Sequence, residues 1–298
     1  MNYKMNIGII GLGLMGGSLA LALKDNFVSL KLYGLDKDKE NLNYALNNNI
    51  IDELLDYENI SELDIIFIAV PVRSVIKVIA DLLPYIDKKK TIVTDMGSTK
   101  EYICQEIKEN YPELNFIPAH PMTGKESSGP QNASSELFIG KTYVIIKENK
   151  EVRDKEIDFI KDKNKSYSYK YLENILKGIG AELIYMDAKR HDEIVALTSH
   201  LPHLLAASIM NLLVASEEKC FNMSRIMGQG YRDFTRIAAC NPSMWQDIFI
   251  TNKEAVIKNI DAFVDELYMF KTALEEDNEE MIYNLMSSAQ KRRLSLEE

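Results

Sequence analysis

The sequence is poor in the residues that build disulfide frameworks, metal centres and nucleic-acid surfaces. It has only three cysteines, which are Cys104, Cys220 and Cys240, and they lie far apart with no C-x-x-C pair. This usage predicts buried, reduced thiols in a cytoplasmic protein without a metal site. The chain carries 35 Lys and Arg residues against 45 Asp and Glu, a net charge of −10. Such a balance excludes a general nucleic-acid binder and fits a soluble metabolic protein.

Long uncharged runs are also scarce, and the two that reach the length of a membrane span have features that spans lack. Residues 5–23 contain five glycines, spaced as in a dinucleotide-binding turn. Residues 194–216 contain Thr, Ser, Asn and His side chains, which are costly in lipid. We therefore predict no membrane partner, and we interpret the second run as a buried core helix with a functional end.

The glycines of the first run form the motif around which the chain is organised. Gly11, Gly13 and Gly16 make a G-x-G-x-x-G between an apolar run suited to a strand and a run of helix formers. A second strand-like run ends at Asp36, 25 residues after Gly11, near the distance of a carboxylate that binds a ribose 2′-hydroxyl. The pattern predicts an NAD site made by Gly11, Gly13, Leu14, Met15, Gly16, Asp36, Val70 and Pro71.

Strand-like and helix-like segments alternate through the first two thirds of the chain. We expect further strands at 63–70, 91–94, 115–119, 142–146 and 181–186, which is the pattern of a doubly wound α/β sheet of Rossmann type. Residues 147–170 are charge-dense and are interpreted as a surface insertion. From residue 188 the chain is expected to be all helical. The predicted domains are therefore 1–187, which binds the nucleotide, and 188–298.

One predicted helix of the second domain has more apolar surface than a single contact needs. Its stripe runs from Val256 to Leu274 and includes Phe263, Leu267 and Phe270. The surplus predicts a homodimer formed through the helical domain.

His120 and Ser98 follow two neighbouring predicted strands, at the edge where open α/β sheets bind ligands. A neutral imidazole there suits removal of a hydroxyl proton while a hydride leaves the same carbon. We expect His120 to be catalytic, with the rate falling at acid pH around the reference imidazole pKa of about 6.5.

Two further clusters lie in the helical domain. His200 and His203 are three residues apart and share a helix face, with Pro202 between them expected to kink the helix. Their spacing fits substrate contact or packing equally well. Arg232 and Arg236 lie four residues apart, an arrangement suited to a dicarboxylate or to surface ion pairs. Trp245, the only tryptophan, is expected in the core, and His191 beside Asp192 is expected to be structural.

Five motifs together resemble the prephenate/arogenate dehydrogenase family of tyrosine biosynthesis. They are GLGLMGGSLA (11–20), DMGSTK (95–100), HPMTGKESSG (120–129), LTSHLPH (197–203) and YRDFTRIA (231–238). The resemblance implies an oxidative decarboxylation in which NAD takes a hydride from the ring carbon bearing the hydroxyl and the ring carboxylate leaves as carbon dioxide.

The resemblance also implies roles for individual residues. His120 resembles the residue that deprotonates the ring hydroxyl, and Ser98 resembles its partner beside the nicotinamide. The substrate-binding residues that it implies are His203, Arg236, His200, Glu126 and Asp233. The chain departs from the family pattern in its charged stretch after Ile146 and in the absence of a regulatory extension after the helical domain.

Three other functions compete with prephenate oxidation. Arogenate as substrate would keep the fold and exchange a keto group for an amine. A 3-hydroxyacid dehydrogenase would need a glycine-lysine motif in the second domain, where the sequence has SHLPH instead. A non-catalytic NAD-sensing protein would not need Ser98, His120 and Arg236 together.

Overall fold

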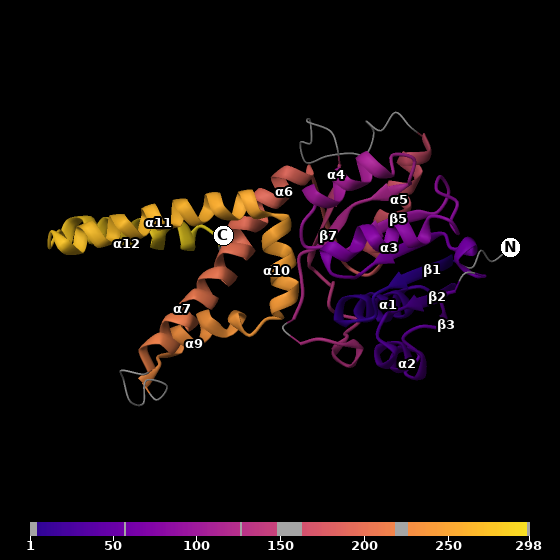
Figure 1. Cartoon of the computed structure of the whole chain (residues 1–298), viewed down its shortest axis with the longest axis horizontal. Helices are drawn as coiled ribbons and strands as arrows, with labels where there is room; N and C mark the ends of the chain where they lie inside the picture. The colour runs from indigo at the N-terminus through magenta and orange to yellow at the C-terminus, as the bar shows by residue number, and fades with distance from the viewer. Residues whose placement is uncertain (1–4, 57, 126, 148–162, 218–225, 297–298) are drawn as a thin grey trace.

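The computed structural model describes residues 5–56, 58–125, 127–147, 163–217 and 226–296. An α/β part forms one end of the molecule, and a helical part projects from it (Figure 1). Most of the charged segment 147–170 lies outside the described residues, as do Glu126 and Cys220. The predicted architecture, a Rossmann-type sheet followed by helices, is confirmed.

A six-stranded sheet of parallel strands forms the centre of the α/β part. Its order is β3-β2-β1-β4-β5-β6, which is the doubly wound order of dinucleotide-binding folds. The strands are β1 (Met5–Ile10), β2 (Leu30–Leu35), β3 (Glu53–Leu54), β4 (Ile65–Ile68), β5 (Ile92–Asp95) and β6 (Phe116–Ile117). The short edge strand β3 was not anticipated from the sequence.

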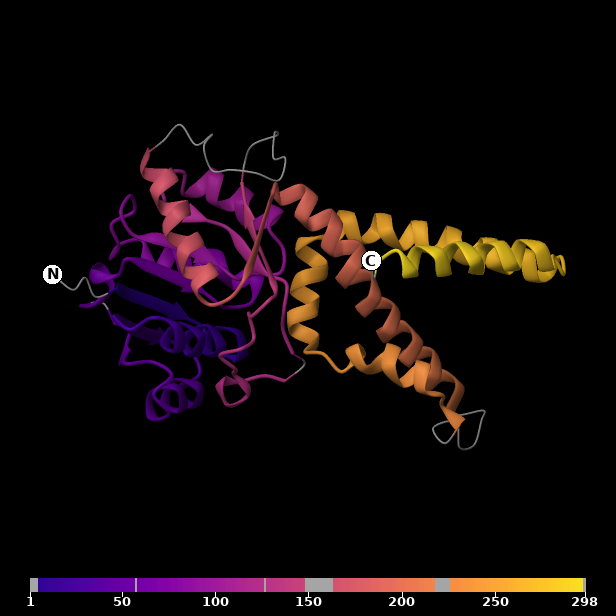
Figure 2. The ribbon, with the colours of Figure 1, turned by 180° about the vertical axis from the view of Figure 1, so that it is seen from behind.

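The strands have continuous apolar runs because helices cover both faces of this sheet. In β4, Ile65 and Phe67 belong to one buried cluster and Ile66 and Ile68 to the other, which follows the two-residue period of a strand. Helices α1 (Leu14–Asn26) and α5 (Lys163–Gly178) contribute to the first cluster, and α3 (Val75–Leu82) and α4 (Glu101–Asn110) to the second. Figure 2 shows α5 in pink on one side of the sheet. Helix α2 (Lys39–Asn47) follows β2.

The predicted strand at 115–119 is wrong in its extent, because the chain divides it between two sheets. Pro118, which has no N–H to donate, separates β6 from β7 (Ala119–Pro121). Strand β7 pairs antiparallel with β8 (Thr142–Ile146), and β8 pairs parallel with β9 (Glu182–Met186). His120 therefore lies within a strand of this second sheet, opposite Val144, and not just beyond a strand of the large sheet.

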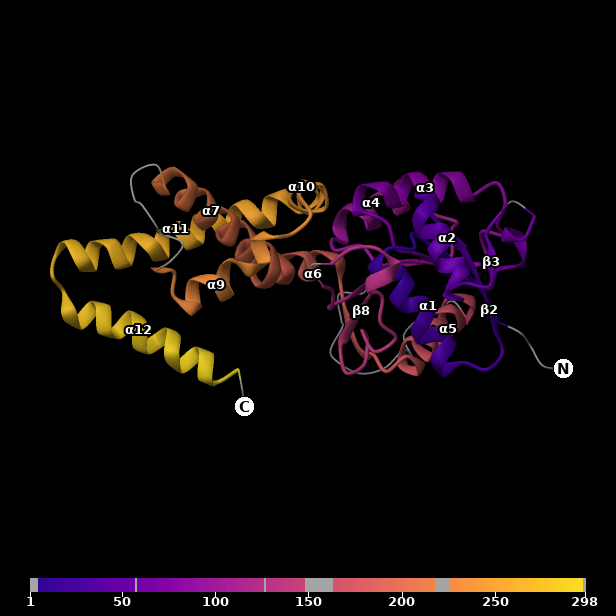
Figure 3. The same ribbon diagram turned by 90° about the horizontal axis from the view of Figure 1, so that it is seen from below.

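The helical part begins directly after β9. Its helices are α6 (Ala188–Val195), α7 (Leu201–Glu217), α9 (Gln229–Thr235), α10 (Pro242–Thr251), α11 (Lys253–Glu275) and α12 (Glu279–Leu294). A π-helical turn, Ala196–His200, joins α6 to α7 immediately before Pro202, where the sequence predicts a kink. Single π turns inside helices occur frequently at functional sites. Figure 3 shows α11 and α12 extending side by side away from the sheet.

The continuous helix Ala188–Leu213 is long and apolar enough to cross a membrane by length and composition alone. Within the protein, 28% of its most apolar 18-residue window is buried. The prediction of a buried core helix is therefore correct for only one face. Leu201 and Ala206 are buried, whereas Leu197 and Leu212 are exposed. The other face of this helix is exposed.

Candidate active site

The turn between β1 and α1 has the backbone that a bound dinucleotide requires. Gly11 adopts φ +93, and a Cβ there would lie 2.4 Å from the carbonyl oxygen of Ala69. At Gly16 a Cβ would lie 1.9 Å from the carbonyl oxygen of Gly11, so only glycine lets α1 pack this close. Gly13 has open space around it and is the N-cap of α1, with no side chain capping that helix. The exposed N–H groups fit a pyrophosphate.

Asp36 supports this turn from the end of β2. One carboxylate oxygen accepts the N–H of Leu12 at 2.6 Å, and the other accepts the N–H of Asp38 at 2.8 Å. A carboxylate offers about four acceptor positions, so Asp36 retains capacity for a ribose hydroxyl.

The other residues assigned to the nucleotide site lie at or near the same turn. Leu14 and Met15 begin α1, and a Cβ on Gly11 would lie 3.0 Å from Val70. Pro71 follows Val70 as the N-cap of the short turn Val72–Ser74.

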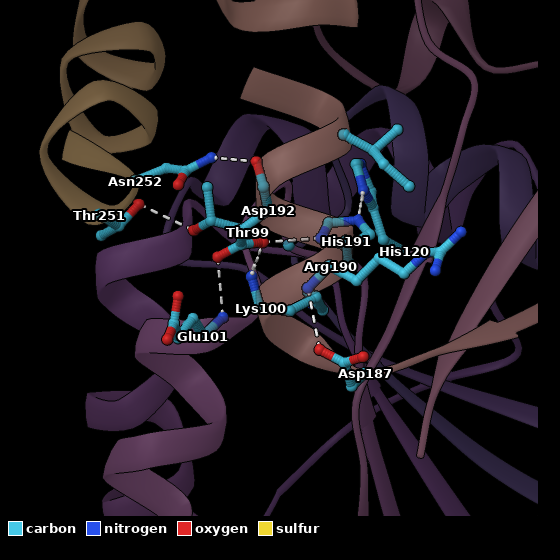
Figure 4. A network of polar contacts seen from close by, with 12 residues as sticks. Thr99, Lys100, Glu101, His120, Asp187, Arg190, His191, Asp192, Thr251 and Asn252 are labelled. Carbon is cyan, nitrogen blue, oxygen red and sulfur yellow. Dashed lines mark hydrogen bonds and ion pairs between the residues drawn. The ribbon is translucent and has the colours of Figure 1, made fainter. Parts of the chain in front are cut away.

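His120 stands at the start of a hydrogen-bonded chain that enters the helical part (Figure 4). Its Nδ1 lies 2.9 Å from Nε2 of His191, and Nδ1 of His191 lies 2.7 Å from Oδ1 of Asp192. His191 and Asp192 are each 1% exposed. The sequence led us to expect a structural His191, and it gives no sign that His191 is hydrogen-bonded to His120, 71 residues away.

Asp192 also joins the two parts of the molecule. Its carboxylate accepts the main-chain N–H groups of Lys100 at 2.8 Å and Glu101 at 2.9 Å, at the N-terminus of α4. Asn252 donates to the Asp192 carbonyl at 2.8 Å, so α6 is held from both sides. Figure 4 shows these groups converging between α4 and α6.

A fully buried ion pair lies beneath His120. The Lys100 ammonium contacts the Asp95 carboxylate and donates to the carbonyl of Ala119, the residue before His120, at 2.8 Å. The N–H of Gly97 donates to Asp95 at 2.9 Å. These additional hydrogen bonds offset part of the cost of burying the two charges.

Burial, followed by the neighbouring His191, Lys100 and His200, holds the pKa of His120 well below its usual value of 6.5. His120 is therefore neutral near pH 7, as a general base must be. The pKa of His200 is also lowered, to about 4, mainly because the ring is buried.

A cavity of about 450 Å³ lies in the helical part, with His203 in its wall. Its walls are formed by His203, Ala207, Ala238, Cys240, Pro242, Trp245, Gln246, Phe249 and Ile250. The rings of His203 and Trp245 stack with their centroids 3.7 Å apart. Trp245 is buried, as predicted, and its indole N–H has no acceptor within the described residues.

The remaining candidates are less closely gathered. Ser98 is partly exposed between β5 and α4. Arg236 and Asp233 are exposed in the segment that packs on α7, and Asp233 accepts from Gln229 at 2.7 Å. The structure thus brings His200 and His203 together around Trp245, whose ring centroid lies 5.9 Å from that of His200 and 3.7 Å from that of His203. Within the described ranges, no three His, Cys, Asp or Glu side chains cluster as metal ligands.

Comparisons with known proteins match both parts of the chain. A family profile described as "Prephenate dehydrogenase, nucleotide-binding domain" matches residues 19–185, and one described as "Prephenate dehydrogenase, dimerization domain" matches residues 187–288. The first match begins after the glycine turn, so the argument for that turn comes from its own geometry.

Relatives and solved structures agree with these profiles. The chain is 30% identical to prephenate dehydrogenase of Bacillus subtilis, over 96% of this chain and 74% of the relative. It is 33% identical to cyclohexadienyl dehydrogenase of Zymomonas mobilis, over 99% of this chain and 97% of the relative. The structure resembles prephenate dehydrogenase of A. aeolicus, solved with hydroxyphenyl propionate and NAD+, with a TM-score of 0.84, 28% identity and 98% coverage of both chains.

Proposed function

This chain belongs to the prephenate dehydrogenase family, and from that premise we propose that it catalyses the NAD-dependent oxidative decarboxylation of prephenate to 4-hydroxyphenylpyruvate. The proposal rests on the environment of His120. Its imidazole is neutral and is held by a buried hydrogen-bonded chain between the nucleotide-binding fold and the helical part. A sensing protein without catalysis would have no need of a base prepared in this way.

In the proposed reaction, Nε2 of His120 accepts the proton of the ring hydroxyl. The glycine turn would hold NAD, which when bound would supply the hydride acceptor for the carbon that carries this hydroxyl. The bond from the ring to its carboxylate then breaks, carbon dioxide leaves, and the electron pair completes the aromatic ring. The phenolate oxygen takes back a proton, which returns His120 to its neutral form. Aromatisation supplies the driving force.

We assign the other roles by the motifs that the chain shares with the family. Ser98 is the partner of His120 beside the nicotinamide, and Arg236 binds a carboxylate of the substrate. His203 and His200 contact the substrate from the helical part. Asp233 and Glu126, the latter outside the described residues, are the acidic members of the substrate-binding set. The stacking of His203 on Trp245 beside a cavity supports a binding role for that helix face.

We propose the division at Asp187 between a nucleotide-binding domain (1–187) and a helical substrate-binding and dimerisation domain (188–298). The match of residues 187–288 to a dimerization domain supports a homodimer formed through the helices. We further propose that the enzyme is cytoplasmic, since its three separated cysteines fit a reducing compartment.

Arogenate is the second candidate substrate, and the resemblance to a cyclohexadienyl dehydrogenase favours testing it. The purified protein should be mixed with NAD and either prephenate or arogenate, and the appearance of NADH followed by its absorbance. A higher kcat/KM for prephenate is expected. Turnover of arogenate alone would make the chain an arogenate dehydrogenase, and turnover of neither would remove the proposed function.

A further inference from the structure

The hydrogen-bonded chain behind His120 determines which of its two ring nitrogens carries a proton. An ionised carboxylate can only accept hydrogen bonds, so Nδ1 of His191, 2.7 Å from Asp192, must be the donor. In a neutral imidazole the other nitrogen then has the lone pair, so Nε2 of His191 accepts. Nδ1 of His120, 2.9 Å away, must therefore carry the proton that it donates. This leaves Nε2 of His120 as the basic nitrogen.

The orientation of Asp192 is set independently of the histidines. Oδ1 accepts the N–H of Lys100 and Oδ2 accepts the N–H of Glu101, both from the first turn of α4. Its main-chain carbonyl is held by Asn252. Asp192 thus transmits a fixed orientation from the nucleotide-binding part, through His191, to the His120 ring.

We propose that His191 and Asp192 are positioning residues that hold His120 as the Nδ1–H tautomer, with the lone pair of Nε2 directed to the substrate hydroxyl. The proposal rests on the proposed function, because it assigns a task to that same base. Nothing new is oxidised or reduced. When Nε2 accepts the hydroxyl proton, Nδ1–H continues to donate to His191, and the Asp192 carboxylate at the end of the chain stabilises the positive charge.

The tautomer can be measured without any turnover. Long-range ¹H–¹⁵N correlation spectra distinguish protonated from bare ring nitrogens, and the chain has only four histidines, so His120→Asn assigns the His120 signals. Near neutral pH, Nε2 of His120 should be bare in the full-length protein. A proton on Nε2 would overturn the proposal, whatever the substrate proves to be.

The kinetic test changes His191, because a change at Asp192 would also remove hydrogen bonds from the start of α4. His191→Leu removes the acceptor for His120 and should lower kcat by about 10²-fold, the lower end of the range for a general base. KM and NAD affinity should remain unchanged, as for a group that acts only in the transition state. His191→Gln, whose amide oxygen can accept from Nδ1–H, should recover part of this loss.

Asp187→Ala is the matched control. The Asp187 side chain caps the same helix by accepting the N–H of Arg190 at 2.9 Å (Figure 4). Its main-chain carbonyl accepts the main-chain N–H of His191 at 3.0 Å, a bond that alanine would keep. This variant should leave kcat and the His120 tautomer unchanged. A wild-type kcat in His191→Leu, or an equal loss in Asp187→Ala, would overturn the positioning role. If neither prephenate nor arogenate is turned over, the proposed function fails while the spectra still decide the tautomer.

Discussion

The chemistry proposed at the level of single residues depends on a histidine that stays neutral inside the protein. Burial, His191 and the Lys100 ammonium all disfavour a second proton on His120, and its pKa lies well below 6.5. The acid loss of rate that the sequence led us to expect around pH 6.5 should therefore occur at lower pH. A buried base with this environment remains competent across the neutral range.

We expect His120→Asn to keep the fold and NAD binding while lowering kcat by about 10²- to 10⁴-fold, the usual contribution of a general base. In the wild type, kcat/KM should stay level as pH falls through 6.5 and decline only well below it, because only the neutral ring accepts a proton. Steady-state rates across this pH range provide the measurement. A midpoint near 6.5 would mean that the base is not desolvated in the free enzyme.

His200 should make folding stability depend on pH. Its pKa is about 4 in the folded protein and about 6.5 when unfolded, so below pH 6.5 the unfolded chain binds a proton that the native state does not. Its contribution is complete above pH 6.5 and decreases as pH falls towards 4, by roughly 3 kcal/mol. Urea unfolding at a series of pH values should show this slope, reduced in His200→Gln. If the free energy of unfolding depends on pH equally in the wild type and in His200→Gln, the lowered pKa of His200 does not contribute to stability.

At this scale the sequence predicts residue types better than it predicts partners. His120 could be proposed as a base from its place near a strand end, and Asp36 from its distance to Gly11. The links between His120, His191 and Asp192 could not, because they exist only once β7 and α6 come together. The adjacency of His191 and Asp192 at the start of a helix was the one available signal.

Among the secondary-structure elements, the β1–α1 turn offers a matched pair of substitutions. In Gly16→Ala the new methyl group would meet the Gly11 carbonyl at 1.9 Å, so α1 must move, an overpacking that typically costs 1–3 kcal/mol, about the size we expect here. In Gly13→Ala the methyl group meets nothing within 4 Å, so stability should hold while NAD affinity falls. Thermal melts and NAD titrations distinguish the two. Equal stability of both variants would show that α1 adjusts freely.

Asp36 should determine the choice between NAD and NADP, because a carboxylate that accepts a ribose 2′-hydroxyl repels a 2′-phosphate. Asp36→Ala should narrow the ratio of kcat/KM for NAD over NADP. It should also weaken the binding of both cofactors, since the N–H of Leu12 loses its acceptor. Asp38→Ala serves as control, because Asp38 caps α2 through Glu40. If the wild-type protein has a higher kcat/KM with NADP than with NAD, Asp36 does not have the proposed role.

The order of elements was predictable because strand-like and helix-like periods alternate plainly along the chain. The separation into two sheets was not. Residues 115–119 read as one apolar strand, and only the missing N–H of Pro118 indicates that pairing changes there. Tertiary pairing with β8 decided where His120 lies.

Considered as a whole, the molecule has the sheet at one end and an arm of helices projecting from it (Figure 3). Many large apolar side chains of this arm are exposed. The broad apolar stripe on α11 was visible in the sequence. The exposed face of α7 was not, because an uncharged segment has the same composition whether its helix is buried on all sides or exposed on one face. The large apolar side chains exposed along α11 and α12 include Ile257, Val264, Leu267, Tyr268, Leu274, Tyr283 and Met286. Exposed apolar surface on this scale is typical of an interface.

We therefore expect the protein to be a dimer that charged substitutions on α11 dissociate. Leu267 and Leu274 are 52% and 62% exposed, and a two-fold interface presents each of them twice. Fully burying an exposed leucine contributes about 1.5–3 kcal/mol, and these two are already about half-buried, so each symmetric pair is worth about 1.5–3 kcal/mol. Replacing both residues by lysine should raise the dimer dissociation constant about 10²- to 10⁴-fold, the loss expected from the two pairs together.

Sedimentation over a range of concentrations would measure this change. Val28→Lys is the control, since that valine is fully exposed in the bend before β2, on the other part of the molecule, and should leave the dimer intact. A wild-type protein that stays monomeric at micromolar concentration would mean that the apolar arm serves a different partner. A dimer unaffected by both lysines would place the interface on α7 and the π-helical turn before it, where Leu212 and Leu197 are exposed.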